Sequence, residues 1–206
     1  MSNDLFAAAL GIQSPWFVQG VNFDEAKRQL TIQVDFVAGS RFAHADAPGE
    51  HPVHDTQIKR LRHLNFFQHE CFLDVRVPRV RLPDGKVRLV EPPWVGRLDG
   101  FTLLFEALVL ALCREMPFAA VARLVGLSWH RVHAICARYV ELALANADLS
   151  DVYEIAIDET SSRRGHHYLT LVADMTARRV IFVTENRDSE CIARFADYLG
   201  AHRGHR

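Results

Sequence analysis

The stretch Ile155-Ala156-Ile157-Asp158-Glu159-Thr160 places a carboxylate in a short run of strand-forming residues. Two further apolar runs follow, at 168–173 and 180–183, and polar turns separate the three. Short β-branched and aromatic runs between polar turns are typical of consecutive antiparallel strands. Because side chains alternate along a strand, Asp158 and Glu159 point to opposite faces. We therefore expect a three-stranded sheet with Asp158 at the end of its first strand.

Asp158 has two interpretations at this level. A carboxylate beside apolar residues costs free energy unless a cation or a hydrogen-bond donor meets it. A divalent metal ion would be such a partner, because hard cations take oxygen ligands. Alternatively, Asp158 caps the turn by accepting hydrogen bonds from the amides of Thr160 or Ser161. The local pattern leaves both roles open.

The composition is that of an ordinary globular protein, with 49% hydrophobic and 24% charged residues among 206. The formal net charge of -1 means that a nucleic-acid partner would have to be held by a local basic patch. The four cysteines lie far apart without a CxxC motif, which indicates reduced core residues of a cytosolic protein. The pattern predicts neither a signal peptide nor a membrane span.

The first 92 residues read mainly as β-structure. Residues 1–33 are interpreted as an N-terminal extension with a helix at 2–10 and a strand at 16–21, and a second strand is predicted at 29–37. The stretch 38–56 has few large apolar residues and carries glycine and proline, which predicts a loop. Strand patterns return at 61–81, and Pro92-Pro93 marks the end of this module.

Basic residues outnumber acidic ones between positions 59 and 88. The acidic side chains there are Glu70, Asp74 and Asp84. The basic ones are Lys59, Arg60, Arg62, Arg76, Arg79, Arg81, Lys86 and Arg88. Such a local excess of positive charge is what phosphate contact requires, and we expect the first five to bind DNA. The alternative is a solvated strand face that contacts no ligand.

Residues 99–147 carry the pattern of a helix-turn-helix. Asp99 is a plausible N-cap for a helix over about 101–114, and Pro117 suits the start of a second helix. Gly126 fits the left-handed turn that ends this second helix, and Ser128 can cap a third. Core positions and a small residue before the turn match the motif, and they are Val121, Ala122, Val125, Leu127, Val132 and Ile135.

The third of these helices would present polar and aromatic side chains outward. The expected DNA-binding residues are Ser128, Trp129, His130, Arg131, His133 and Arg138. Those at the start of the helix would face base edges, whereas the arginines would reach bases or phosphates. The alternative is an ordinary pair of antiparallel helices buried in a core. Beyond the strands of the last segment, a helix is expected at about 190–199 with Ser189 as its cap.

Five stretches of the chain carry a common pattern. They are Val53-His54-Asp55-Thr56, Arg62-His63-Leu64, Arg76-Val77-Pro78-Arg79-Val80, the segment 101–108 and the segment 157–166. Together they resemble the ISL3 family of bacterial insertion-sequence transposases. The resemblance implies a zinc-ribbon-like module, a helix-turn-helix and an RNase H-like catalytic domain of the DDE class. In that class Asp158 would correspond to the first metal-binding aspartate.

The chain departs from this family at its metal sites. Cysteine pairs hold zinc in the family, whereas the matching places here are the segments 43–47 and 81–84, which contain none. We therefore expect a degenerate module without zinc, and the loosely spaced histidines His44, His51, His54 and His63 are the alternative ligands. The partners of Asp158 would lie beyond Arg206, so Mg²⁺ or Mn²⁺ is expected in intact relatives but not bound tightly here.

The resemblance implies an α+β, multidomain, truncated transposase. Its expected parts are the extension 1–33, a degenerate zinc-ribbon-like module at 34–92, a helix-turn-helix at 99–147 and the start of an RNase H-like domain at 151–206. Its expected partner is double-stranded DNA at terminal inverted repeats, in a bacterial cytoplasm, and a homodimer is compatible with this. The alternatives are a non-catalytic DNA-binding regulator and a nuclease completed by a second chain.

Overall fold

The structure is a computed structural model that describes residues 2–163 and 167–203. The chain divides into two compact units, residues 1–140 and 141–206, and each is described by itself. The sequence predicted a turn at 161–165, but residues 161–163 belong to a strand that ends at Arg163, and Arg164 and Gly165 lie outside the described residues.

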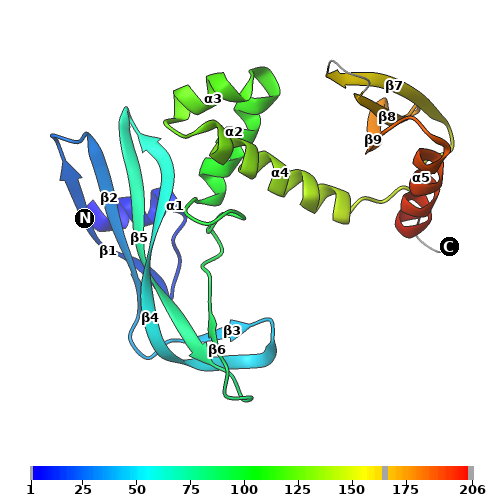
Figure 1. The fold of residues 1–206 in the computed structure, drawn as a ribbon. Helices are drawn as coiled ribbons and strands as arrows, with labels where there is room; N and C mark the ends of the chain where they lie inside the picture. Colours follow the sequence, from blue (N-terminus) through cyan, green and yellow to red (C-terminus); the bar gives the residue numbers. More distant parts are fainter. Residues whose placement is uncertain (1, 164–166, 204–206) are drawn as a thin grey trace. The chain divides into compact units, whose positions relative to one another are not determined.

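A six-stranded sheet forms most of the first unit (Figure 1). Its strands are β1 (Trp16–Asp24), β2 (Gln29–Phe36), β3 (Arg41–His44), β4 (Ala47–Phe66), β5 (His69–Arg81) and β6 (Val87–Leu89). Their order is β1-β2-β5-β4-β3, and β6 pairs with β5. Neighbouring strands are antiparallel except β2 and β5, which are parallel.

Alternating apolar side chains build the core of this sheet. In β2 every second residue from Leu30 to Phe36 is buried, and in β5 the same holds from Cys71 to Val77. Helix α1 (Ser2–Leu10) adds Phe6 and Leu10 to the edge of the same core. Residues 1–33 therefore share one core with the segment 34–92, although the sequence suggested a separate extension, because β2 pairs directly with β5.

The loop predicted at 38–56 is wrong. Strand β3 and the first half of β4 form a hairpin there, and β4 runs for 20 residues. Large apolar residues are scarce in this hairpin because much of it is exposed on both faces, with Phe42 and His51 as its buried pair. Backbone pairing thus sustains strands that the apolar pattern did not predict.

Three helices begin within one apolar cluster of the first unit, and the last of them continues past residue 140. They are α2 (Leu103–Glu115), α3 (Phe118–Val125) and α4 (Trp129–Ala145). The predicted cap Asp99 is wrong, because Thr102 is the N-cap of α2 and its side chain accepts from the Phe105 amide. Phe101, Phe105, Val109, Val121, Ala122, Val125, Val132 and Ile135 form the buried core of the cluster.

The second unit is a three-stranded antiparallel sheet with one helix. Its elements are β7 (Ile155–Arg163), β8 (His167–Asp174), β9 (Arg179–Glu185) and α5 (Ser189–His202), with β8 in the centre. The predicted cap Ser189 is wrong by one residue, because the Asp188 side chain accepts from the Cys191 amide. Phe195 of α5 joins Val172 and Ile181 in a small core.

Candidate functional site

The turn between α3 and α4 has the geometry that its sequence predicts. Gly126 adopts φ 70° and ψ 31°, a left-handed conformation that favours glycine, and its amide donates to the Ala122 carbonyl. Ser128 then caps α4, since its Oγ accepts from the Arg131 amide at 3.3 Å. Val121 and Val132 are fully buried between the helices. The local chemistry of the turn therefore fixes how α4 leaves α3.

The first turns of α4 present an aromatic cluster to solvent. Trp129 is 47% exposed, and its ring stacks on His133 with centroids 5.1 Å apart and an angle of 15°. His130 meets the same indole edge-on at 5.4 Å. Phe118 of α3 contacts both Trp129 and His133, at 6.0 and 6.2 Å. These rings hold one another in place at the surface.

Arg131 makes a hydrogen bond and a cation–π contact within the first unit. Its Nη2 donates to the Asp99 carbonyl at 2.9 Å, and its guanidinium lies 4.4 Å from the centre of the Phe101 ring. Such a stacked, hydrogen-bonded guanidinium contributes to structure. Arg131 therefore holds the segment before α2 against α4, and the direct DNA contact that the sequence suggested for this exposed residue stays a prediction.

Other arginines of the helical region remain at the surface. Arg138 is exposed on α4. Arg114 in the last turn of α2 and Arg123 on α3 are also exposed. Neither of these two forms an ion pair among the residues that the structure describes. Sequence reasoning missed both arginines because it weighed only the outward face of α4.

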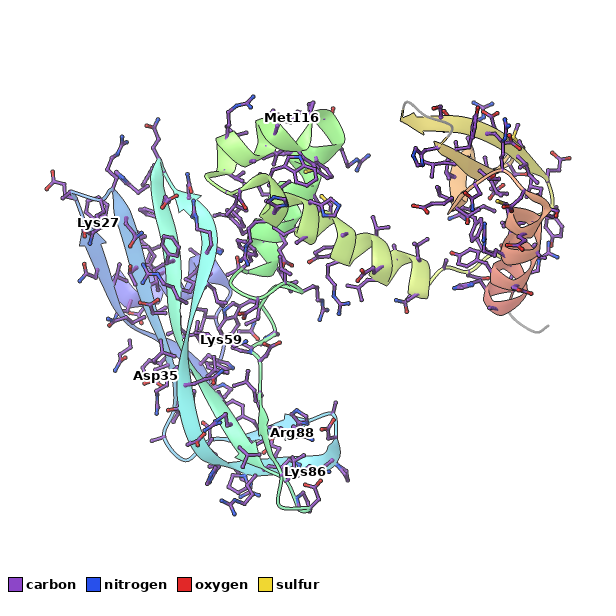
Figure 2. The ribbon with its side chains drawn as sticks, in the orientation of Figure 1. Lys27, Asp35, Lys59, Lys86, Arg88 and Met116 are labelled. Atoms are coloured by element: carbon purple, nitrogen blue, oxygen red, sulfur yellow. The ribbon has the colours of Figure 1, made fainter. Side chains whose placement is uncertain are left out.

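The basic side chains of the predicted patch are paired with acidic or polar groups, most of them from another segment of the chain. Lys59 meets Glu91 at 2.8 Å and Asp99 at 3.3 Å, and Arg60 meets Asp74 at 3.0 Å. The others follow the same rule: Arg76 pairs with Asp35, Arg79 with Asp55, Arg81 with His54, Lys86 with Asp84 and Arg88 with Asp46. Figure 2 marks Asp35, Lys59, Lys86 and Arg88 on this unit. The apparent basic surface is largely neutralised within the fold.

Arg62 and His63 join the sheet to the helices. Arg62 is buried, donates to the carbonyls of His63 and Cys71, and pairs through its own backbone with Gly100 and Thr102. The Nδ1 of His63 lies 2.9 Å from the Thr102 Oγ1. Burial, reinforced by the Arg62 charge, lowers the pKa of His63 to about 4. His63 is thus neutral at pH 7 and helps to hold the sheet against the start of α2.

Glu106 is a buried hub that sequence reasoning did not identify. Its carboxylate is fully buried and accepts from the amides of Arg97 and Leu98 and from the Tyr139 hydroxyl, each at 2.7 Å. A Cβ at position 96 would lie 2.5 Å from one carboxylate oxygen, so Gly96 makes room for the acid. Burial and this hydrogen bond raise the pKa of Tyr139 to about 12. The hub ties α2, α4 and the preceding segment together.

Asp158 lies inside β7, because the strand continues to Arg163. It is exposed, and its Oδ1 accepts from the Glu159 amide at 2.8 Å, whereas the sequence predicted Thr160 or Ser161 as the donor. Register pairs Asp158 with Leu171, which places the Asp174 side chain on the opposite face of the sheet. Asp158 is therefore accessible to a ligand.

The other carboxylates of the sheet are not beside Asp158. Asp174 is buried and caps the β8–β9 turn, accepting from the amides of Thr176 and Ala177 at 3.0 and 3.1 Å. Glu185 shares the face of Asp158 but stands two strands away and two residues further along, about 12 Å between Cα atoms from strand spacing. Among the described residues, Asp174 and Glu185 therefore do not join Asp158 in the cluster of carboxylates that two divalent ions require.

An ion pair holds the segment 43–47, one of the two places that would match a zinc module. Arg88 Nε lies 2.9 Å from an oxygen of Asp46, which links β6 to the turn between β3 and β4. The candidate ligands His51, His54 and His63 each contact a different partner, and the Asp46 amide donates to His44. Among the described residues, no three His, Cys, Asp or Glu side chains gather as a metal site.

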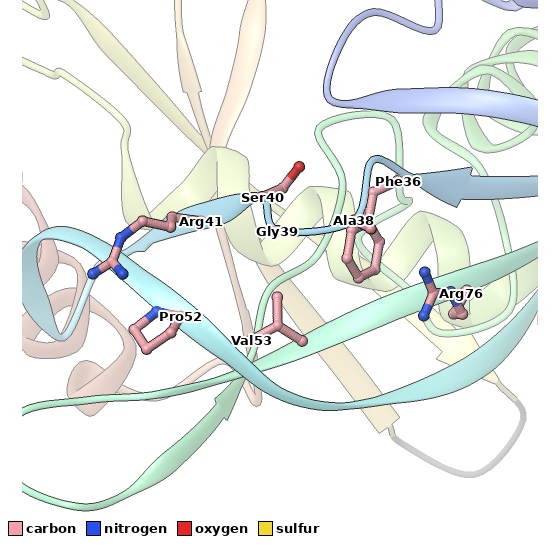
Figure 3. A pocket seen from close by; sticks show the side chains of 8 residues that line it. All are labelled: Phe36, Ala38, Gly39, Ser40, Arg41, Pro52, Val53 and Arg76. Carbon is pink, nitrogen blue, oxygen red and sulfur yellow. The ribbon is translucent and has the colours of Figure 1, made fainter.

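One hollow of about 410 Å³ lies on the first unit (Figure 3). Its rim includes Arg41 and Arg76, and Phe36 and Val53 line it as well. Arg76 is held by Asp35 at 2.6 Å and stacks over Phe36, while Arg41 donates to the Glu50 carbonyl. Both guanidinium groups thus already have partners, and we do not include the hollow in the candidate site.

Comparison with known proteins matches two family models to separate parts of the chain. The helix-turn-helix domain of transposase family ISL3 matches residues 90–140, and a transposase domain of the same family matches residues 155–206. No solved structure matches the chain. In the part of the chain that the structure describes, no helix combines the length and the apolar composition that crossing a membrane requires.

Two kinds of curated relative are similar to this chain. The transposase for insertion sequence element IS1557 of Mycobacterium tuberculosis is 27% identical over 97% of this chain and 46% of its own length. The transposase for insertion sequence element IS1001 of Bordetella parapertussis is 31% identical over 71% of this chain and 36% of its own length. The chain thus spans about half the length of the first of these relatives.

Proposed function

Because this chain belongs to the ISL3 family of insertion-sequence transposases, we propose that it binds double-stranded DNA through its helix-turn-helix. The observation that carries the proposal is the exposed start of α4. That helix leaves a glycine turn at a defined angle and presents Trp129, His130 and His133. In this motif the start of the second helix enters the major groove, and the first helix crosses the backbone.

Phosphate contacts in this proposal come from the helical region. Arg114, Arg123 and Arg138 are exposed there. Arg114 and Arg123 form no ion pair among the described residues, whereas Lys59, Arg60, Arg62, Arg76 and Arg79 have partners within the first unit. Moving a paired arginine to a phosphate would leave its acid unpaired, so the sheet cations would gain little from DNA. We assign them to holding the sheet, and we assign Arg131 to holding the segment before α2.

Binding to a fluorescently labelled duplex at increasing salt tests this function. If Arg114, Arg123 and Arg138 each neutralise one phosphate, the logarithm of affinity falls against the logarithm of salt with a slope of about -3. The readout is fluorescence anisotropy of the full chain. An affinity that is equal at low and high salt, or no binding at all, would show that the exposed helix serves another purpose.

The second unit would be the start of an RNase H-like DDE domain, and the segment 34–92 of the first unit would be a zinc-ribbon-like module without its metal. In intact relatives Asp158 would supply one ligand for Mg²⁺ or Mn²⁺, and it stands exposed on a sheet face for that role. A single carboxylate holds Mg²⁺ weakly, because this ion keeps its waters unless several oxygens replace them. We therefore propose that the described residues alone do not cut or join DNA.

Cleavage of a labelled duplex carrying the terminal repeats of a related element tests this second point. The native chain and Asp158→Ala are compared with Mg²⁺ or Mn²⁺, and neither should exceed background. Metal-dependent cleavage by the native chain that disappears in Asp158→Ala would mean that Glu185 or a second copy completes the site.

A further inference from the structure

The second helix of the helix-turn-helix has an unusual outward surface. Arg131, the basic residue closest to its start, is held by the Asp99 carbonyl and the Phe101 ring. Arg138 stands about two turns further along the helix. The start of α4 therefore lacks, among the described side chains, a free arginine of the kind that usually binds guanine in the major groove. Another group must read the bases.

The stack of Trp129 on His133 is the surface that remains. A tryptophan that is 47% exposed leaves apolar area in water, and burying that area against a ligand is favourable. The indole is not loose, because His133 covers one face and Phe118 lies behind it. A preorganised apolar surface at a helix start loses little side-chain entropy on binding.

Resting on the proposed function, we infer that the Trp129–His133 stack is the specificity-determining surface of α4. The exposed part of the Trp129 indole contacts the C5-methyl group of a thymine. The edge of the His133 imidazole, whose face is covered by the stack, hydrogen-bonds the N7 acceptor of a neighbouring purine. Both features lie in the major groove, where the thymine methyl and the purine N7 distinguish base pairs.

Arg131 is a positioning residue in this arrangement. Its contacts tie the start of α4 to the segment that leads into α2, and a Cβ added at Gly100 would lie 3.1 Å from its Nη2. Loss of Arg131 should therefore lower affinity for all duplexes alike. Loss of Trp129 should change which duplex is preferred.

The experiment starts by selecting duplexes from a random-sequence pool with the full chain. Single thymines of the selected duplex are then replaced by deoxyuridine, which removes only the C5-methyl group. At one position the native chain should lose about three- to fivefold in affinity, the effect of exposing one methyl group. The Trp129→Ala variant should bind more weakly and show no further loss at that position.

A second arm replaces single purines by their 7-deaza analogues, which removes the N7 acceptor. The native chain should lose affinity at one position where His133→Ala shows no further loss. Val140→Ala is the matched control, because Val140 is an exposed apolar residue about three turns further along α4. This control should retain both the selected sequence and its sensitivity to the methyl group.

The outcomes separate this inference from the proposed function. Absence of duplex binding by the native chain overturns both. Specific binding in which Trp129→Ala keeps the native sequence preference and the native loss on deoxyuridine overturns only the inference. Circular dichroism and salt-dependent binding to non-selected duplexes show that each variant is folded, so a change of preference is not mistaken for unfolding.

Discussion

Replacement of Glu106 by glutamine should destabilise the first unit far more than its conservative chemistry suggests. One carboxylate oxygen accepts from both the Arg97 amide and the Tyr139 hydroxyl, and the other accepts from the Leu98 amide. Glutamine keeps only one acceptor oxygen. If that oxygen serves Arg97 and Tyr139, the new amino group faces the Leu98 amide, so that donor meets donor.

The magnitude follows from one unsatisfied buried donor. Such a group costs about 1–3 kcal/mol, and with about 4 °C per kcal/mol for a unit of this size the melting temperature falls by about 4–12 °C. Alanine at the same position leaves all three donors without a partner and should cost about 3–6 kcal/mol. Glu115→Gln is the control, because Glu115 is exposed on the same helix, and it should change stability by less than about 0.5 kcal/mol.

Thermal unfolding followed by tryptophan fluorescence suits this comparison. All three tryptophans, Trp16, Trp94 and Trp129, lie in the first unit, so the signal reports that unit alone. Equal melting temperatures for Glu106→Gln and Glu115→Gln would refute the reasoning, because the buried carboxylate would then not be holding its three donors.

Three further predictions concern pH, the second sheet and zinc. The pKa of His63 is about 4 in the fold and 6.5 in the unfolded chain. The free energy of unfolding is therefore highest above pH 6.5, and it falls by up to about 3 kcal/mol as the pH drops toward 4. Urea midpoints should show this fall, and His63→Gln should flatten it; an unchanged slope would contradict the assignment. Asp174→Ala should destabilise the second unit by about 1–2 kcal/mol through its lost turn bonds, whereas Asp158→Ala should change it by less than about 0.5 kcal/mol, measured by circular dichroism. Elemental analysis of untagged protein should find less than one zinc per chain, since no thiolate pair is present; one zinc per chain would point to His44, His51, His54 or His63.

The helix-turn-helix was predictable because its determinants are local. Gly126 favours the left-handed turn, and the Ser128 side chain caps α4 by accepting a hydrogen bond from the amide three residues later. The apolar positions around them recur at helical spacing, so burial of Val121 and Val132 followed from the pattern. Such features are contained in about twenty consecutive residues.

The state of the basic side chains was not predictable, because their partners are distant in the sequence. Counting charges between positions 59 and 88 misses Asp35, Asp46, Asp55 and Glu91, which pair with these cations from segments outside that range. Strand pairing across the sheet, and not the local composition, decides which charges meet. Glu106 escaped notice for a related reason, since two of its three donors are backbone amides that carry no sequence signal.

The same limit applies to Asp158. Strand alternation predicted that Asp158 and Glu159 point to opposite faces, and the register of β7 agrees with this. The predicted strand end was wrong, because β7 continues through polar residues that pair with β8. Backbone pairing with a central strand extends an edge strand beyond its apolar run. The role of Asp174 as a turn cap likewise depends on amides that only the folded hairpin brings together.

The central claim is that DNA contacts the helix-turn-helix while the sheet cations serve the fold. The salt dependence of duplex binding by Arg123→Ala and Arg60→Ala tests it most directly. Arg123 is exposed without an ion pair among the described residues, so its removal should reduce the salt slope by about one. Arg60 is held by Asp74 and Gln29, and its removal should leave the slope unchanged. A reduced slope for Arg60→Ala with a native slope for Arg123→Ala would contradict the account.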